Sequence, residues 1–305
     1  MAQATTATLT SNMATYFDAK LLMIATPLLK HEQFCTPKSV VQGAGKTVSY
    51  TRYNVPANST SLAEGVNVTT AIPTSTSVTA TLIEEGYAEQ VSELLARTNI
   101  DTMMTERIDG VLGAHSGNTL DQRARDEMYN GATTTFANGR ANAAAITASD
   151  VLNTTNVRKA NRLLKSAFAP LRKDTGRYAA AISEFAELDL TSDATWVGAK
   201  QYSDVNDLYT SYIGTWLNFD FVVSNQGKTE ASTVTVYSNF FMGEEAIAKL
   251  ELSGSGTPKV YVKTSDDHDT SQPLPMFMTM GWKAIVTYKT LNSAYIVNMK
   301  SASAG

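Results

Sequence analysis

The residues that could do chemistry are few and scattered. The three histidines, His31, His115 and His268, lie far apart, and none has a second histidine or a cysteine at metal-ligand spacing. The segment Gly43–Thr47 (GAGKT) resembles the end of a phosphate-binding loop, but it lacks the earlier glycine and precedes a strand-like segment instead of a helix. These residues therefore favour a plain glycine-rich turn over a nucleotide site.

The densest group of oxygen ligands is Asp266–Asp269 (DDHD). It lacks the glycine and the distal glutamate of a calcium loop, so a solvated turn is favoured and calcium binding is the alternative. Cys35 is the only cysteine, which excludes an internal disulfide, and no orienting context for a thiol nucleophile is visible. The sequence therefore predicts no catalytic, cofactor-binding or metal site, and no enzyme.

One cluster of like charge remains. Between residues 158 and 177 the chain carries seven basic residues and only one acidic residue, Asp174; the basic residues are Arg158, Lys159, Arg162, Lys165, Arg172, Lys173 and Arg177. No series of aromatic residues alternates with them for base stacking. A solvated face, or salt bridges to a neighbouring subunit, is the favoured interpretation, and a sequence-independent contact with packaged DNA is the alternative.

Composition points to a protein that is covered by other protein. Charged residues make up 18% of the 305 residues, below the roughly 25% of typical soluble domains, although an ordinary secreted β-protein has a similar composition. The net charge of -4 excludes a general attraction to nucleic acid over the whole surface. We expect neither a signal peptide nor a transmembrane helix, and expect folding in a cytoplasm.

Two strand-like segments stand out among the elements. Residues Thr47–Tyr53 and Val78–Ile83 alternate as half-buried strands do, and the polar stretch Asn54–Ser77 separates them. Hairpin loops are usually about two to five residues long, and a two-stranded ribbon alone is marginal in water. We therefore expect a projecting β-arm that becomes ordered on a neighbouring subunit.

Periodicity predicts several helices. One includes Phe17, Leu21, Ile24 and Leu28, and it is either a core helix or an exchanged arm. Others are expected over Tyr87–Arg97 and Met103–Leu112. The clearest runs from Thr119 to Ala137, is opened by a capping box and carries a narrow apolar stripe: Leu120, Ala124, Met128, Ala132 and Phe136. It is expected to lie as a strut across a sheet, and a further helix is expected from Thr154 to Phe168.

The second half of the chain predicts mainly strands. These are expected at Tyr178–Ser183, Phe219–Val223, Thr233–Tyr237 and Val260–Val262. The runs Trp282–Tyr288 and Tyr295–Met299 are predicted to form a hairpin that returns to the strut helix. The fold class expected from these elements is α+β.

The order of these parts resembles a tailed-bacteriophage major capsid protein of the Hong Kong ninety-seven-like fold, and is most similar to the coat proteins of podophage N-four type. Each motif is unspecific, and their order carries the resemblance: Val48–Tyr53, Leu62–Val66, Thr79–Tyr87, Asn153–Leu164, Asp189–Trp196 and Gly281–Ala284. The resemblance implies a shell of hexamers and pentamers that encloses double-stranded DNA in the virion, assembled in the host cytoplasm, with decoration, scaffold or portal partners and no membrane.

The resemblance also implies a division of the chain. It places an N-terminal arm at 1–41, an extended β-loop at 42–85, a peripheral domain with a spine helix at 86–149, an axial domain at 150–272 and a C-terminal hairpin of the peripheral domain at 273–305. The expected inter-subunit residues of the loop are Tyr50, Arg52, Tyr53, Leu62, Glu64 and Val66. An encapsulin-like compartment and a phage tube or fibre protein are the rival interpretations.

Overall fold

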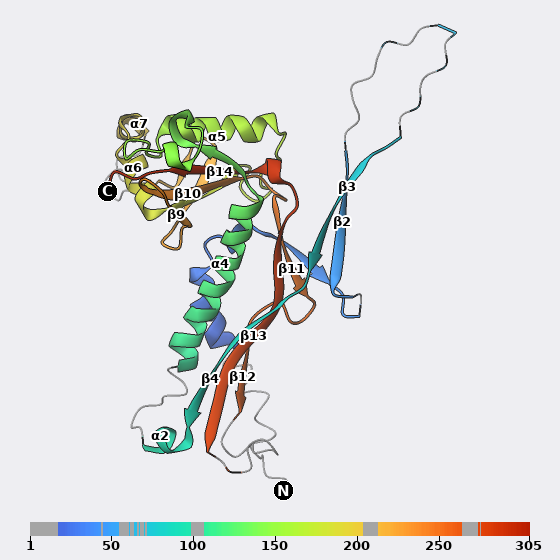
Figure 1. Ribbon diagram of the computed structural model, residues 1–305, viewed down its shortest axis with the longest axis vertical. Helices are drawn as coiled ribbons and strands as arrows, with labels where there is room; N and C mark the ends of the chain where they lie inside the picture. Colours follow the sequence, from blue (N-terminus) through green and yellow to red (C-terminus); the bar gives the residue numbers. More distant parts are fainter. Residues whose placement is uncertain are drawn as a thin grey trace.

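The computed structural model describes residues 18–43, 45–54, 61, 64–65, 67, 70, 72–98, 107–203, 213–263, 274 and 276–305. These residues form two sheets and a separate two-stranded ribbon, with helices packed on both sheets (Figure 1). The mixed α+β class is therefore confirmed.

The first sheet is long and narrow. Its strand order is β1-β11-β13-β12, and β4 also pairs with β13. The strands are β1 (Thr36–Val40), β4 (Glu84–Ser92), β11 (Ile247–Leu252), β12 (Lys259–Lys263) and β13 (Phe277–Thr290). The alternate residues Trp282, Ala284, Val286 and Tyr288 of β13 are buried, and they belong to the same core as helix α4.

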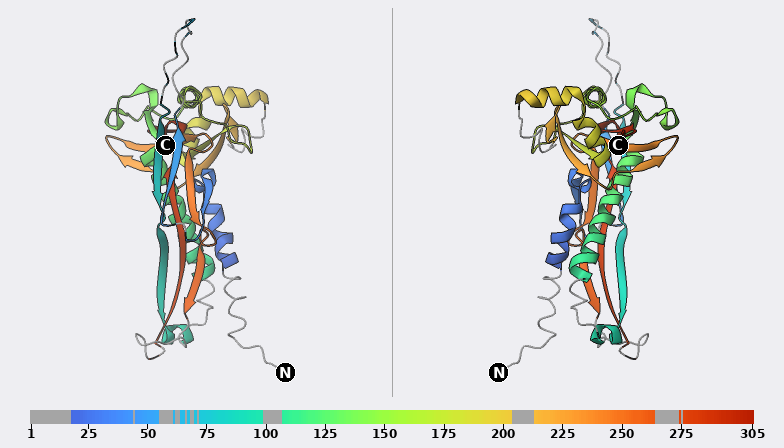
Figure 2. Two further views of the ribbon diagram at one scale, coloured as in Figure 1. Left: turned by 90° about the vertical axis from the view of Figure 1, so that its right-hand side faces the viewer. Right: turned by 90° about the vertical axis from the view of Figure 1, so that its left-hand side faces the viewer.

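Helix α4 (Gly113–Gly131) is the strut that covers this sheet, and Figure 2 shows it alongside the long strands. Leu120, Ala124 and Met128 recur every fourth residue and are fully buried. A second helix, over residues 18–25, crosses α4 at Gly117, where an added Cβ would lie 2.7 Å from the carbonyl oxygen of Ala25. The absence of a side chain at this position therefore allows the close approach of the two helices.

The second sheet has seven strands. Its order is β5-β14-β10-β6-β8-β7, with β9 beside β10. The strands are β5 (Thr133–Phe136), β6 (Tyr178–Ser183), β7 (Thr215–Trp216), β8 (Phe219–Ser224), β9 (Thr229–Ala231), β10 (Thr235–Met242) and β14 (Ile296–Ser301). Phe240 and Met242 of β10 enter the core that contains α4, whereas Phe241 enters a second core on the opposite face.

Three helices belong to the part of the chain around this second core. They are α5 (Thr154–Ser166), α6 (Glu184–Thr191) and α7 (Ala194–Ser203). Asn153 caps α5, because its side chain accepts a hydrogen bond from the backbone N–H of Asn156, and Ser183 caps α6 in the same way. Val157, Ala160 and Leu164 are buried, as the periodicity predicts, and the predictions of α5 and of β6 are confirmed.

Several sequence expectations are wrong. Residues 84–92 form strand β4 instead of part of a helix over Tyr87–Arg97, and only α2 (Glu93–Thr98) is helical there. The strut helix begins at Gly113, and Thr119 does not cap it, because its hydroxyl donates to the carbonyl oxygen of His115 at 2.7 Å. It ends at Gly131 because the threonine-rich segment Thr133–Phe136 pairs with β14.

The predicted C-terminal hairpin is also wrong, and the two sheets draw their strands from more than one of the predicted segments. Strands β13 and β14 belong to different sheets, so residues 273–305 do not form a hairpin. The predicted 150–272 axial segment contains β11 and β12, which belong to the long sheet, while β5 and β14 outside that segment belong to the seven-stranded sheet. Within the predicted N-terminal arm, β1 pairs with β11 and the 18–25 helix packs on α4, as the core-helix alternative expects.

Candidate functional site

The two-stranded ribbon is the part of the fold that stands apart from the body (Figure 1). Its strands β2 (Thr47–Tyr53) and β3 (Ser75–Thr81) pair only with each other, and the ladder continues to a backbone hydrogen bond of 2.9 Å from Asn54 to Thr74. The base is anchored in a small core that contains Ala80, Leu82 and Leu250. The ribbon therefore has a fixed root and a projecting outer part.

Side chains along the ribbon change from half-buried to exposed. Tyr50 packs against the root core, and this partial burial raises the pKa of its hydroxyl. Arg52 and Tyr53, two and three residues further along β2, are exposed, and Tyr53 exposes 76% of its surface. Glu64 lies in an exposed turn, and the predicted contact residues Leu62 and Val66 lie outside the described residues.

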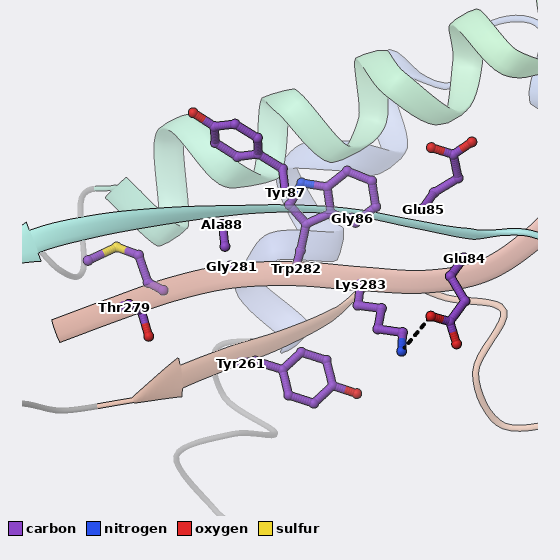
Figure 3. A pocket seen from close by; sticks show the side chains of 11 residues that line it. Glu84, Glu85, Gly86, Tyr87, Ala88, Tyr261, Thr279, Gly281, Trp282 and Lys283 are labelled. Carbon is purple, nitrogen blue, oxygen red and sulfur yellow. Dashed lines mark ion pairs between the residues drawn. The ribbon is translucent and has the colours of Figure 1, made fainter. Parts of the chain in front are cut away.

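An open groove of about 490 Å³ lies on the long sheet (Figure 3). Tyr87 points toward α4 and Tyr261 lies on the opposite side of the sheet. Between them β4 and β13 approach closely at Gly281. An added Cβ there would lie only 2.5 Å from the carbonyl oxygen of Tyr87, so a side chain does not fit. Lys283 and Glu84 form an ion pair at 3.1 Å at one end of the groove.

The groove offers stacking and hydrogen bonding, and no nucleophile paired with a base lines it. The ring of His115 contacts those of Tyr87 and Trp282 at tilted angles, with ring centroids 4.5 and 5.9 Å away. Because an indole N–H only donates, Nδ1 of His115 accepts the 3.2 Å hydrogen bond from Trp282 Nε1. This histidine therefore has a structural role between the helix and the sheet.

The other candidate chemical residues remain apart. Cys35 is buried, and desolvation raises the pKa of its thiol well above the usual value. In the segment Gly43–Thr47 strand β2 begins at Thr47, where a phosphate-binding loop would open a helix. Asp266–Asp269 lies outside the described residues, and across the described part of the chain no group of three or more His, Cys, Asp or Glu could hold a metal ion.

The structure divides the basic cluster in two. Arg172, Lys173 and Arg177 each form an ion pair within the chain, with Asp174, Glu244 and Asp220 respectively. Arg158, Arg162 and Lys165 are exposed on α5, and no ion pair among the described residues reaches them. The cluster is therefore not a single basic surface.

A buried polar network was missed from the sequence. Asp121 of α4 is fully buried, and its carboxylate accepts hydrogen bonds from the backbone N–H groups of His31 and Glu32, at 2.6 and 3.1 Å, and pairs with Nδ1 of His31 at 2.7 Å. Glu32 in turn pairs with Lys249 at 2.6 Å and accepts from the hydroxyl of Tyr288. These partners lie about ninety or more positions apart in sequence, so no local pattern reveals them.

None of the helices in the described part of the chain is long and apolar enough to cross a membrane. In comparisons of sequence, no protein-family model and no curated protein matches this chain.

Comparisons of structure give similar folds among phage capsids. The capsid of cyanophage Pam1 aligns over 87% of both chains with a TM-score of 0.65 and 16% identity. A chain from Mycobacterium phage Che8 aligns over 84% of both chains with a TM-score of 0.62 and 15% identity. The capsid of Ralstonia phage GP4 covers 88% of this chain and 87% of its own, with a TM-score of 0.62 and 15% identity.

These likenesses cover between 84 and 88% of this chain. The narrower similarity to coat proteins of podophage N-four type stays an expectation from the sequence. The chain has the Hong Kong ninety-seven-like fold of tailed-phage capsid proteins.

Proposed function

We propose that this chain is a major capsid protein, a structural protein whose copies assemble as hexamers and pentamers into an icosahedral shell around phage double-stranded DNA. Assembly takes place in the host cytoplasm, and decoration, scaffold or portal proteins complete the virion. The support is the capsid fold together with a ribbon that has few partners in its own chain.

The exposed ribbon is the observation that carries the proposal. A two-stranded ribbon is marginal in water, and ordering each residue costs roughly 1–2 kcal/mol of conformational entropy. At the root of the ribbon, burial in the small core offsets this entropy cost. The outer residues have no such burial among the described residues, and Tyr53 is 76% exposed. A neighbouring copy that covers the ribbon would supply the missing contacts.

From the likeness to phage capsid folds, we further propose that the seven-stranded sheet with α5, α6 and α7 is the axial part, which lies at the centre of a capsomer. The long sheet with α4 is the peripheral part. Tyr50, Arg52, Tyr53, Leu62, Glu64 and Val66 are the proposed contact residues of the ribbon.

The test is electron microscopy of the expressed protein and of a variant that lacks residues 58–72. The intact chain should form closed shells, and the deletion should leave a folded, soluble subunit that forms unstable shells or none. A matched control replaces residues 58–72 by a flexible Gly/Ser linker of equal length, which keeps the reach of the loop but removes its side chains. Stable shells of normal size from the deletion variant would contradict the mechanism, and nucleic acid inside the particles separates a virus from a compartment with protein cargo.

A further inference from the structure

Two surface patches of opposite charge lie on the part of the chain around the seven-stranded sheet. The first, which we term the basic patch, comprises Arg162 and Lys165 in the last part of α5 and the apolar residues Phe168 and Leu171 that follow it. The second, the acidic patch, lies on α6 and comprises Glu184, Phe185, Glu187 and Leu188. The four apolar side chains are 87, 43, 36 and 54% exposed, in chain order.

The two patches lie at opposite ends of this sheet. Helix α5 begins beside the end of α6, because the N–H of Thr154 donates to Asp193 at 2.8 Å. It ends beside the turn that follows β10, where the N–H of Glu244 donates to the carbonyl oxygen of Pro170 at 2.9 Å. A helix of 13 residues is about 20 Å long, and Figure 1 shows α6 at the end of the sheet where β10 begins, away from the end of β10 that the turn follows. One chain cannot therefore bring its own two patches together.

Neither patch is neutralised within the chain. Among the residues that the structure describes, no ion pair reaches Arg162, Lys165, Glu184 or Glu187. Partial burial raises the pKa of Glu187, and no ion pair between described residues offsets this cost. Nearby surface charges behave differently, since Arg172, Lys173 and Arg177 are all paired.

Phe168 gives independent evidence for an external partner. It occupies the position after the C-cap of α5 and has a left-handed backbone, with φ of 54°. The N–H of Phe168 donates to Lys165 at 3.1 Å and that of Ala169 donates to Leu164 at 3.0 Å, which is the pattern of a Schellman motif. Glycine or asparagine usually occupies this position, because a bulky residue is strained there. The backbone of Phe168 caps α5, but its side chain is 87% exposed and buries little apolar surface in its own chain.

We propose that the basic patch of one copy binds the acidic patch of the next copy, head to tail, and so joins neighbouring subunits around the capsomer axis. Arg162 and Lys165 lie against Glu184 and Glu187, and Phe168 and Leu171 lie against Phe185 and Leu188. Because different surfaces of each copy meet, the contact is heterologous, and such contacts close into rings when the rotation between copies is suitable. This inference rests on the proposed function and names the residues of one contact within it.

A second copy explains the patches better than DNA does. DNA would be attracted to the cations alone, and phosphates gain nothing from exposed phenylalanine and leucine at the same place. The matched numbers of charges and of exposed apolar residues in the two patches instead fit the apolar centre and charged rim of a protein interface.

A charge exchange tests the contact. Three variants are compared with the intact chain for shell formation by sedimentation and electron microscopy: R162E with K165E, E184K with E187K, and all four changes together. Each double variant places like charges opposite each other and should lower the yield of shells at least about tenfold, while the quadruple variant restores opposite charges and should restore assembly.

The substitution F168N keeps the test independent of how the charge variants fold. Asparagine is favoured in a left-handed backbone, so the unassembled subunit should melt at the same temperature as the intact chain or higher, while shell formation decreases. A shell yield equal to that of the intact chain would overturn the inference, whatever the melting temperature of the subunit.

The remaining outcomes distinguish the contact between copies from DNA binding and from failure of the proposed function. Shells at the normal yield from both double variants, or a folded quadruple variant that does not assemble, would overturn the contact and leave the proposed function standing. Normal shells with less nucleic acid from R162E with K165E would assign the basic patch to DNA instead. Failure of the intact chain to form any shell would refute the proposed function itself.

Discussion

Asp121→Asn tests how the N-terminal segment is held on the strut helix. The substitution keeps the size of the side chain and removes its charge, so it acts on the hydrogen bonds of this fully buried carboxylate with little change in packing. The backbone N–H groups of His31 and Glu32 would still find one oxygen, whereas the new amide would face Nδ1 of His31, which now pairs with Asp121 at 2.7 Å.

The expected loss follows from these three hydrogen bonds. A hydrogen bond to a charged group contributes about 1.5–3 kcal/mol, roughly twice a neutral one. Two bonds that weaken by half and a third that is lost or reversed give a loss of about 3 kcal/mol in the free energy of unfolding, near the lower end of the range for breaking a buried ion pair. In a chain of this size such a loss lowers the melting temperature by roughly 5–10 °C.

The assay is urea unfolding of unassembled subunits isolated by size exclusion, followed by tryptophan fluorescence. Asp126→Asn on the same helix is the matched control, because Asp126 is 40% exposed and pairs with Arg125 and Lys228 at 3.0 and 3.1 Å. An exposed pair of this kind contributes about 1 kcal/mol or less. The reasoning is refuted if Asp121→Asn costs less than about 1 kcal/mol, or no more than the control.

Two further predictions concern acid stability and strand packing. Burial raises the pKa of Asp150, but hydrogen bonds from the N–H of Thr147 and from Arg140 and Asn138 outweigh it and hold this pKa well below its usual range. The stabilisation is therefore present above the unfolded pKa of about 3.9 and is lost as the pH falls through that value toward the folded one. Asp150→Asn should lower stability at pH 7 and flatten its decline between about pH 5 and 3 in urea titrations; an unchanged decline would show that Asp150 does not cause it. Gly281→Ala should cost about 1–3 kcal/mol, because its Cβ would lie 2.5 Å from the carbonyl oxygen of Tyr87 and separate β4 from β13. Gly198→Ala in α7 meets no atom within 4 Å and should instead stabilise the subunit by about 1 kcal/mol, so equal effects of the two changes in thermal melts would contradict this account.

Some elements of the fold are set by residues within their own segment, and the sequence predicts these. Strands β2 and β6 and helix α5 follow from periodicity and capping residues that lie within each segment, and they are predicted at or near their observed limits. Helix α5 is predictable because its apolar stripe lies within the segment and needs only one apolar surface to pack on. The buried residues of this stripe are Val157, Ala160 and Leu164.

Other elements depend on partners that local sequence does not specify. Residues 84–92 contain apolar residues at helical spacing, yet β13 offers an unpaired edge over nine residues, and pairing with it overrides helix propensity. The same holds for Thr133–Phe136, which a helical stripe includes and which the edge of β14 converts into a strand.

The candidate contact surfaces are also predicted only in part from the sequence. The sequence predicts the ribbon and the basic cluster, but only the structure separates Arg172, Lys173 and Arg177, which are paired, from Arg162 and Lys165, which are not. It alone places Glu184 and Glu187 at the other end of the same sheet, because the direction of α5 and of β6 decides which ends meet.

The sequence by itself determined the α+β class, the ribbon, helix α5 and the lack of any recognisable catalytic motif, because each depends on the types and spacing of neighbouring residues. The tertiary structure decided which strands share a sheet, the pairing of Asp121 with His31 and the position of the two charged patches. Those features arise from contacts between residues far apart in the chain, and the free energy of such contacts is set by geometry that only the folded molecule has.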